Sequence, residues 1–273
     1  MPQVSAPTTQ ATGRVVRSPH AAWLRVEGHW QWYRRHWHST LFSSIAQPIL
    51  FLVAMGMGFG SQVEPSEATR NLPYLVYLAP AMLVVGALQN AVGESSYPVL
   101  SGFKWQKDYW AVTATPITPG QLLAGQQIWI ALVIGFNGCA FVLIATLLGA
   151  VQSPGILLSL LAMVLTGMAC SAPVVALAAT VTNDGNAFNG IFRFVVMPMT
   201  LFSGTFFPVS QLPEWAQPVV WLSPLWHGTE LSRAAAFGGA EFGPVFGHVA
   251  YLVGLFALGI WLARWRFRRR LVV

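Results

Sequence analysis

Charged residues are scarce in this chain of 273 residues: they make up 9% of it, whereas hydrophobic residues make up 55%. Soluble domains carry about 25% charged residues, so the composition indicates an integral membrane protein. Only two cysteines are present, Cys139 and Cys170, and both lie inside apolar runs. We therefore expect no disulfide framework, and neither cysteine has the spacing of a metal site.

Motifs that carry chemistry are also missing. The sequence has no GxxxxGK[ST] motif, so the loop that cradles a nucleotide phosphate is absent from it. A membrane-embedded transferase would need a polar constellation such as paired carboxylates, and an ion-coupled transporter usually shows mid-membrane charges and repeated halves. Neither pattern is visible, and both classes stay as alternatives. We expect no catalytic residue, no metal site and no cofactor bound by this chain.

Long apolar runs, in contrast, are abundant. A bilayer core about 30 Å thick takes about 20 apolar residues as a helix, and six segments qualify. None alternates apolar and polar residues as a barrel strand would, so we predict an all-α integral membrane protein with a transmembrane domain over residues 39–270. The six predicted spans are about 39–60, 73–95, 121–149, 156–181, 188–208 and 245–264.

Basic residues are unevenly distributed about these spans. With six spans, thirteen of the fifteen Lys and Arg residues fall on one side, and Arg70 and Arg233 fall on the other. Loops rich in Lys and Arg stay in the cytoplasm, so we expect both termini there and the chain in the cytoplasmic (inner) membrane. The net charge of +6 then reflects membrane orientation, and no nucleic acid partner is expected.

The region before the first span divides into two parts. Residues 1–19 are rich in Ser, Thr and Pro and are expected to form a disordered cytoplasmic tail. Residues 20–38 are predicted to form an amphipathic helix in the cytoplasmic interface, with its aromatic face toward lipid. At a helical period this face holds Trp23, Val26, Trp30, Tyr33 and Trp37. The helix serves either as an anchor for span one or as a lateral gate for substrate.

The segment between spans two and three, SGFKWQKDYWAVTATPITPGQ, holds three large aromatics beside charged residues. This combination is typical of interface hot spots, so a short cytoplasmic helix here would suit a docking surface. A helix lying flat on the lipid headgroups is the alternative. The candidate docking residues are Lys104, Trp105, Lys107, Asp108, Tyr109 and Trp110.

The segment LFSGTFFPVSQLPEW and its continuation, which includes WLSPLWHGTELSR, are too apolar for a plain loop. They also carry too many prolines for a plain span: four lie within residues 208–224. Prolines favour breaks between short helical pieces. Irregular backbone at membrane depth is tolerated where protein or water covers it. We therefore expect short, broken helices between spans five and six.

Together these two segments resemble the permease subunits of type-2 ABC exporters. The ATPIT-like turn before span three and the SG…FP…LP…W…PL.H spacing are most similar to nodulation-factor exporter and antibiotic-resistance permeases, and the resemblance covers about residues 30–270. It implies a coupling helix that docks on a separate ABC ATPase, present in two copies, which would bind ATP and Mg. It also implies an outer re-entrant helical hairpin and a second permease copy or a sister permease. The expected function is outward transport of an amphiphilic or lipid-linked substrate: a drug, glycolipid or lipo-oligosaccharide.

Four residues near the outer side are candidates for a gate or substrate path. Phe206 and Phe207 stand directly before Pro208, and His227 and Glu230 follow in the broken segment. Apolar rings can close a path to water and still yield to an amphiphile. Packing within the subunit is the alternative for the two phenylalanines, and a hydrogen bond that fixes the hairpin is the alternative for His227.

Gly56 and Gly60 form a G-x-x-x-G spacing at the end of span one. Such spacing lets two helices approach closely. We predict a dimer seam at spans one and five, with close packing inside one chain as the alternative for these two glycines.

Overall fold

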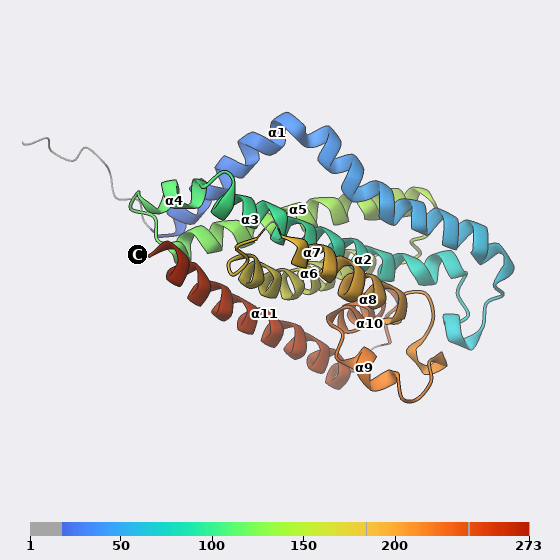
Figure 1. The fold of residues 1–273 in the computed structure, drawn as a ribbon. Coiled ribbons are helices and arrows are strands. Elements are labelled where there is room, and N and C mark those ends of the chain that lie inside the picture. The colour runs from blue at the N-terminus through green and yellow to red at the C-terminus, as the bar shows by residue number, and fades with distance from the viewer. Residues whose placement is uncertain (1–17, 184, 240, 273) are drawn as a thin grey trace, which may run out of the picture.

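The computed structural model is built of helices (Figure 1). It describes residues 18–183, 185–239 and 241–272, without the side chains of residues 18, 19, 36–45, 47, 48 and 68. Within this part every regular element is a helix, which confirms the all-α prediction. Residues 1–17 of the predicted tail lie outside the described residues.

Four helices of the described chain are long and apolar enough to cross a membrane. Their positions coincide with four of the predicted spans, because each is an uninterrupted apolar run. They are α2 (Tyr74–Ser95), which continues as α3 (Tyr97–Lys104), α5 (Pro119–Leu147), α6 (Ile156–Ala178) and α11 (Phe242–Leu271). Helix α5 begins sharply because Thr118 and Gln121 cap each other's backbone N–H groups.

The first helix, α1, runs unbroken from Ser18 to Phe51. It continues as a π-helical stretch, Leu52–Gly58 (η1), and a 3-10 turn, Phe59–Gln62 (η2). The boundary expected near residue 38 is therefore not a break in the helix, although the ribbon bends sharply in its middle (Figure 1).

Part of the aromatic face of α1 turns toward protein. Val26 and Tyr33 are buried against Trp129 of α5, so the expectation that they face lipid is wrong. Trp23 and Trp30 remain exposed. The close approach depends on Gly125, because a methyl group there would lie 2.5 Å from the Ala22 carbonyl oxygen.

The fifth apolar segment is shorter than predicted. Helix α7 (Asn186–Ile191), the π-helical η4 (Phe192–Val196) and α8 (Met197–Phe202) follow one another, and regular helix ends at Phe202 rather than at residue 208. The chain turns there because Gly204 adopts φ +77°, a left-handed conformation that glycine reaches without strain. The prediction of a helix to residue 208 is therefore wrong at its end.

Short helices connect the long ones on the side where α8 ends. They are η3 (Glu67–Thr69), η5 (Val209–Gln211), α9 (Gln217–Trp221) and α10 (Pro224–Phe237). Pro218 and Pro224 occupy the first turns of α9 and α10, where a missing N–H costs no hydrogen bond. Prolines thus start these pieces, as the broken-helix prediction requires. The helix α4 (Asp108–Thr113) lies at the opposite end of the bundle (Figure 1).

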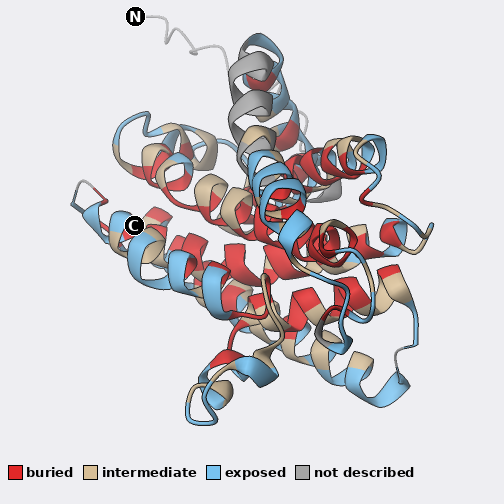
Figure 2. Cartoon of the chain, turned by 90° about the vertical axis from the view of Figure 1, so that its right-hand side faces the viewer, coloured by how far each residue is buried: buried red, intermediate tan, exposed pale blue. Residues whose placement is uncertain are grey.

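Helix α2 forms the centre of the bundle. Most of its residues are buried, and it contacts α6, α10, α5 and η1. Figure 2 shows buried residues on the inner faces and exposed residues on the outer faces of the surrounding helices. Helix α11, in contrast, is mostly exposed apolar surface, as suits contact with lipid.

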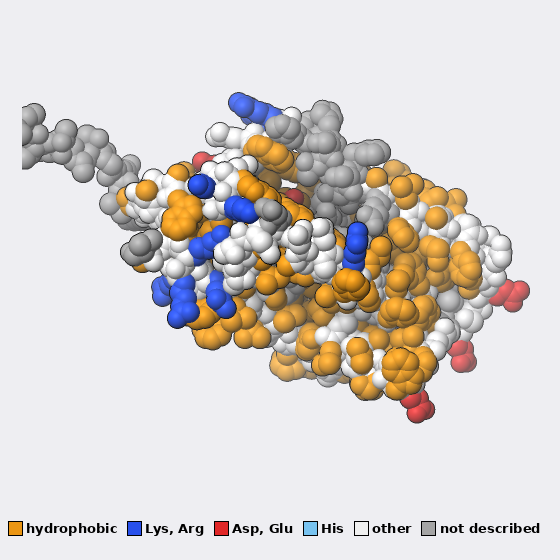
Figure 3. All heavy atoms as spheres, in the orientation of Figure 1, with side chains coloured by type: hydrophobic (Ala, Val, Ile, Leu, Met, Phe, Trp, Pro, Cys, Tyr) orange, Lys and Arg blue, Asp and Glu red, His pale blue; other side chains and the backbone are white. Residues whose placement is uncertain are grey.

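The two ends of the bundle differ in charge. On the visible face, most Lys and Arg side chains gather at the end that holds α4 and the end of α11, and most acidic side chains lie at the other end (Figure 3). We call these the basic end and the acidic end.

Candidate functional site

At the basic end, the segment 104–110 joins α3 to α4, and it contains all the predicted docking residues. Lys107 adopts φ 55° at the turn between the two helices, and Asp108 opens α4. Trp105 is 51% exposed and Trp110 is 38% exposed, and Lys107 is exposed as well. Two large aromatic side chains therefore face outward next to a lysine at this end.

Asp108 fastens α4 to the first helix. Its Oδ2 accepts a hydrogen bond of 2.7 Å from Nη1 of Arg25, and both side chains are largely shielded from solvent. The Arg25 guanidinium also lies over the Tyr109 ring, 5.0 Å from its centroid. A partly buried, hydrogen-bonded pair of this kind holds its geometry better than a surface ion pair.

Tyr109 is fully buried, so the expectation that it belongs to an exposed aromatic cluster is wrong. Its ring packs edge-on against Phe103 and beside Phe267, and it fills the space next to Gly102 that a Cβ would otherwise occupy. Burial raises the pKa of its hydroxyl above the usual value. The neutral hydroxyl donates to Oε1 of Gln126 at 3.2 Å.

His29 of α1 donates to the same oxygen. Its Nε2 lies 2.9 Å from Gln126 Oε1, which can only accept, and its ring stacks on Trp129. Burial, together with the nearby charge of Arg25, lowers the pKa of His29 from 6.5 to about 4. One side-chain oxygen of α5 therefore receives hydrogen bonds from both α1 and α4, and it joins the three helices.

A groove between α1 and α5 lies beside this junction. Its volume is about 630 Å³, and its walls are mainly aromatic and apolar, with Glu27 and Arg34 among the lining residues. The aromatic lining consists of Trp23, Trp30, Tyr33, Trp129 and Phe136. Such a surface suits an apolar chain, whether of a membrane lipid or of a substrate.

At the acidic end, the turn of residues 203–207 is held from two sides; we call it the outer turn. Arg233 of α10 donates from Nη1 to the Gly204 carbonyl at 2.7 Å and from Nη2 to the Thr205 carbonyl at 3.0 Å. The Phe206 carbonyl accepts a hydrogen bond from the Tyr74 hydroxyl at 2.9 Å. Three consecutive carbonyls are thus fixed by α10 and α2.

Arg233 itself is buried, and its charge is balanced locally. The guanidinium carbon lies 4.0 Å from the centroid of the Tyr77 ring, and Nη1 lies 3.7 Å from Oε1 of Glu230. A buried guanidinium needs such partners because its desolvation costs several kcal/mol. Glu230 therefore supports the arginine that holds the outer turn, and its place in a substrate path stays a prediction.

The outer turn presents Phe206 and Phe207 to a cavity of about 680 Å³, which we call the outer cavity. The cavity lies among η1, the start of α2 and the end of α8, and no charged side chain of the described residues lines it. Aromatic rings dominate the wall, with Ser66, Thr69 and Gln211 as polar members. The structure brings the two phenylalanines together at this opening.

His227 lies away from the outer cavity. Its Nε2 donates to the Trp221 carbonyl at 2.9 Å, and its Nδ1 lies 2.7 Å from Nδ1 of His248. Its ring stacks on Tyr251 at 3.9 Å between centroids. Burial lowers the pKa of His227, so the neutral ring accepts at Nδ1 and His248 donates. These contacts match the alternative in which His227 fixes the hairpin.

Gly56 and Gly60 face α2 of the same chain. A methyl group at Gly56 would collide with Leu75, and one at Gly60 would lie 3.2 Å from the Tyr74 ring. The close approach that these glycines permit is therefore made within the chain. Their role in a seam between two copies stays a prediction.

Sequence comparison connects these two ends to known proteins. A profile of the ABC-2 type transporter family matches residues 21–237, a stretch that includes the segment 104–110, the outer turn and Arg233. The chain belongs to the ABC-2 type transporter family. It is accordingly a multi-pass membrane protein of the permease type, as the resemblance in the sequence implied.

Several relatives share most of this ABC-2 chain. Nodulation protein J of Sinorhizobium fredii is 29% identical over 217 residues, which are 76% of this chain and 81% of the relative. Nodulation protein J of Bradyrhizobium diazoefficiens is 28% identical over 254 residues, which are 92% of this chain and 93% of the relative. The probable multidrug ABC transporter permease YbhR of Escherichia coli is 25% identical over 168 residues, 60% of this chain and 44% of the relative.

Sequence reasoning missed the residues that organise both ends of the ABC-2 chain. Arg25 and Arg233 were counted only as markers of orientation, and Gln126 was not singled out. A signal existed for Arg233, because it is one of two basic residues expected on the outer side. Arg25 and its partner Asp108 are 83 residues apart in sequence, and Gln126 lies 97 residues from His29 and 17 from Tyr109, so no local pattern could reveal these contacts.

Replacing His29 should change how stability depends on pH. The folded state lowers the pKa of His29 to about 4, so its contribution is complete above about pH 6.5 and is lost as pH falls toward 4. At most about 3 kcal/mol is involved, at 1.36 kcal/mol per pKa unit. The melting midpoint of His29→Gln in detergent should fall less between pH 7 and pH 4.5 than that of the wild type. Exposed His20 provides the control: His20→Gln should keep the wild-type slope, and an equal slope for His29→Gln would contradict the assignment.

Replacing Arg233 with Lys should loosen the outer turn. Lysine keeps the charge but cannot donate to two carbonyls in the planar geometry of a guanidinium. Loss of one charged hydrogen bond should destabilise the fold by roughly 2 kcal/mol, measured as a lower melting midpoint. The matched control is Arg70→Lys, since Arg70 is exposed near the same end. Equal melting midpoints for the two variants would show that the clamp contributes little.

Proposed function

We propose that this ABC-2 chain is the membrane subunit of an ATP-driven exporter in the cytoplasmic membrane. The proposed six spans are the second part of α1 with η1, then α2, α5, α6, the α7–η4–α8 segment and α11. Both termini would lie in the cytoplasm, because Lys and Arg gather at the end that holds α4 and the end of α11 (Figure 3). Membership of the ABC-2 family favours this proposal over an ion-coupled transporter or a transferase.

The observation that carries the proposal is the two-sided character of segment 104–110. Its inner side is anchored by Asp108 and the buried Tyr109, and its outer side presents Trp105 and Trp110. Membrane subunits of this family are not themselves ATPases and work with ATPase partners. We infer that a separate ABC ATPase, in two copies that bind ATP and Mg, docks on this surface. The ABC-2 chain would supply the path and the mechanical link.

The proposed cargo is amphiphilic or lipid-linked. The α1–α5 groove at the basic end and the outer cavity at the acidic end both have mainly apolar, aromatic walls, and polar groups are few in each. Such lining suits a molecule with an apolar part and a few hydrogen-bonding groups. A drug, a glycolipid and a lipo-oligosaccharide all have this character. The similarity to YbhR, a probable multidrug ABC transporter permease, adds support for a drug-like cargo.

Two permease chains would enclose the path, with spans one and five at their seam. Both spans carry large exposed apolar side chains: Met57 and Phe59 near the end of span one, and Phe194 and Met197 in span five. The outer cavity lies between these same two segments. Since Gly56 and Gly60 already pack on α2, the exposed side chains are the better candidates for contact with a second copy or a sister permease.

Removing the two exposed tryptophans should weaken docking of the ATPase. Each truncated hot-spot residue typically costs at least about 2 kcal/mol of binding, so the Trp105→Ala, Trp110→Ala variant should lose most of the ATPase that co-purifies with the tagged wild-type chain. The control is Trp215→Ala, because Trp215 is 80% exposed but lies in the outer segment. Recovery of the ATPase at wild-type yield with the double variant would reject this surface.

We further propose that Phe206 and Phe207 form the outer gate. Two rings at the opening of an uncharged cavity can exclude water by apolar contact. Phe206→Ala with Phe207→Ala should therefore raise ATP hydrolysis without substrate or leak small solutes from reconstituted vesicles. Phe242→Ala at the start of α11, where the ring is 84% exposed and lines neither the outer cavity nor the proposed seam, serves as the control. Lower stability with hydrolysis and transport falling together would indicate packing alone, and a well-folded variant with unchanged coupling would also refute the gate.

A further inference from the structure

Asn137 of α5 carries a buried amide group without a partner. The residue is 4% exposed, and neither its Nδ2 nor its Oδ1 has a hydrogen-bond partner among the described residues. An unpaired amide in an apolar environment costs roughly 2–7 kcal/mol. In the hydrocarbon region no surrounding water can relieve this cost. A polar partner inside the bundle is therefore required.

A small cavity lies beside this amide, where α2, α5 and α6 meet. The space open to the centre of a water molecule is about 10 Å³, which is the room that about one water molecule needs. The cavity exists because Gly86 and Ala87 of α2 and Gly138 of α5 have little or no side chain. Met82 and Met163, both buried, close it.

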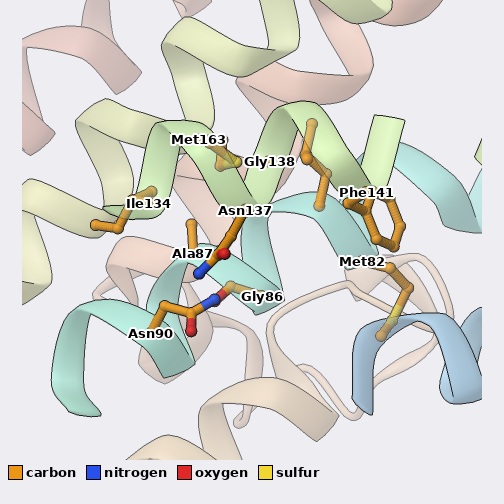
Figure 4. A pocket seen from close by; sticks show the side chains of 10 residues that line it. Met82, Gly86, Ala87, Asn90, Ile134, Asn137, Gly138, Phe141 and Met163 are labelled. Atoms are coloured by element: carbon orange, nitrogen blue, oxygen red, sulfur yellow. The ribbon is translucent and has the colours of Figure 1, made fainter. Parts of the chain in front are cut away.

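A second amide borders the same cavity. Figure 4 shows the Asn137 side chain leaving α5 toward α2, with the Asn90 amide of α2 beside it in this view. Asn90 donates from Nδ2 to the Gly86 carbonyl of its own helix at 2.9 Å, so its Oδ1 remains as an acceptor. No charged side chain lines the cavity, so it offers an ion no countercharge.

We propose that this cavity binds one water molecule that bridges Asn137 of α5 and Asn90 of α2. The water would accept a hydrogen bond from Asn137 Nδ2 and donate to Asn137 Oδ1 and Asn90 Oδ1. Three hydrogen bonds are typical for a buried water. The bridging water would then join α2 to α5 by hydrogen bonds, which the small residues around the cavity cannot form with their side chains. This inference does not depend on the proposed transport function.

Hydroxyl-radical footprinting by X-ray radiolysis of the purified protein tests the site. Radicals formed from a bound internal water oxidise neighbouring side chains that bulk solvent does not reach, and Met82 and Met163 are the reporters. Both should form sulfoxide in the wild type despite their burial. The exposed Met57 normalises the radical dose. Absence of oxidation at both buried methionines would overturn the proposal, because it would mean that the cavity is dry.

Two substitutions decide whether the oxidation comes from this water. Asn137→Leu fills a similar volume without polar atoms, so it should displace the water and reduce oxidation of Met163 severalfold at unchanged oxidation of Met57. Asn137→Ser keeps a polar group and enlarges the cavity, so oxidation should persist. Asn90→Leu removes the other hydrogen-bond partner of the water, and oxidation of Met163 in this variant tests the site if Asn137→Leu does not fold. Undiminished oxidation of Met163 in the folded leucine variants would also overturn the proposal.

Discussion

The interior of a bilayer offers no hydrogen bonds to the groups placed in it, and every buried polar group must find its partner in the protein. Some polar side chains of this chain bond within their own helix, as Thr166 does to the Ala162 carbonyl, but three serines bond to other helices. The Ser159 hydroxyl of α6 donates to the Ser232 carbonyl of α10, and the Ser232 hydroxyl donates to the Pro80 carbonyl of α2, both at 2.8 Å. Ser171 of α6 donates to Gln127 of α5, also at 2.8 Å. These hydrogen bonds between helices determine which helix faces pack together. Apolar contacts alone would not determine it, because lipid tails are as apolar as the helix surfaces.

The same constraint gives α2 its place at the centre of the bundle. Its outer end supplies Tyr74 and Tyr77 to the outer turn and its clamp, and its inner end continues through α3 into α4. The basic end and the acidic end are thus connected through one buried helix. A displacement of α2 would therefore alter contacts at both ends of the bundle, which is the physical requirement for coupling between them. The π-helical stretches η1 and η4 lie in the two apolar segments that border the outer cavity, and such stretches are frequent at functional sites.

Composition and run length were sufficient for the parts of the fold that depend on local sequence. Four long helices lie where uninterrupted apolar runs predicted them, and prolines begin the short outer helices as expected. The end of span five was misjudged because the apolar run continues through Phe206 and Phe207, whereas the helix stops at Phe202. The turn is fixed by Arg233, whose partner carbonyls lie 28 and 29 residues earlier in the chain. A hydropathy pattern contains no information about such a contact.

The candidate docking segment shows the same limit at the level of single side chains. Trp105, Tyr109 and Trp110 look alike in composition, and a helix of six residues is too short for a period to tell the inner face from the outer one. What separates them is the space beside Gly102, which accepts the Tyr109 ring, and the Gln126 oxygen that receives its hydroxyl. The sequence predicts Trp105 and Trp110 as aromatic residues of a short segment beside charged residues. The burial of Tyr109 depends on its contacts with α5 and α11, which no local pattern shows.

Arginines on which the predicted orientation rests also bind groups at the ends of helices. Arg25 pairs with Asp108 in the first turn of α4, and Arg233 satisfies two carbonyls just after α8. Arg270 of α11 donates from Nη1 to the carbonyls of Ala179 and Val181 beyond the end of α6, each at 3.0 Å. Carbonyls at a helix end lack partners within the helix and favour a positive charge. Near a membrane a charge is stable only when it is paired or hydrated, so these arginines are well suited to tie helix ends together.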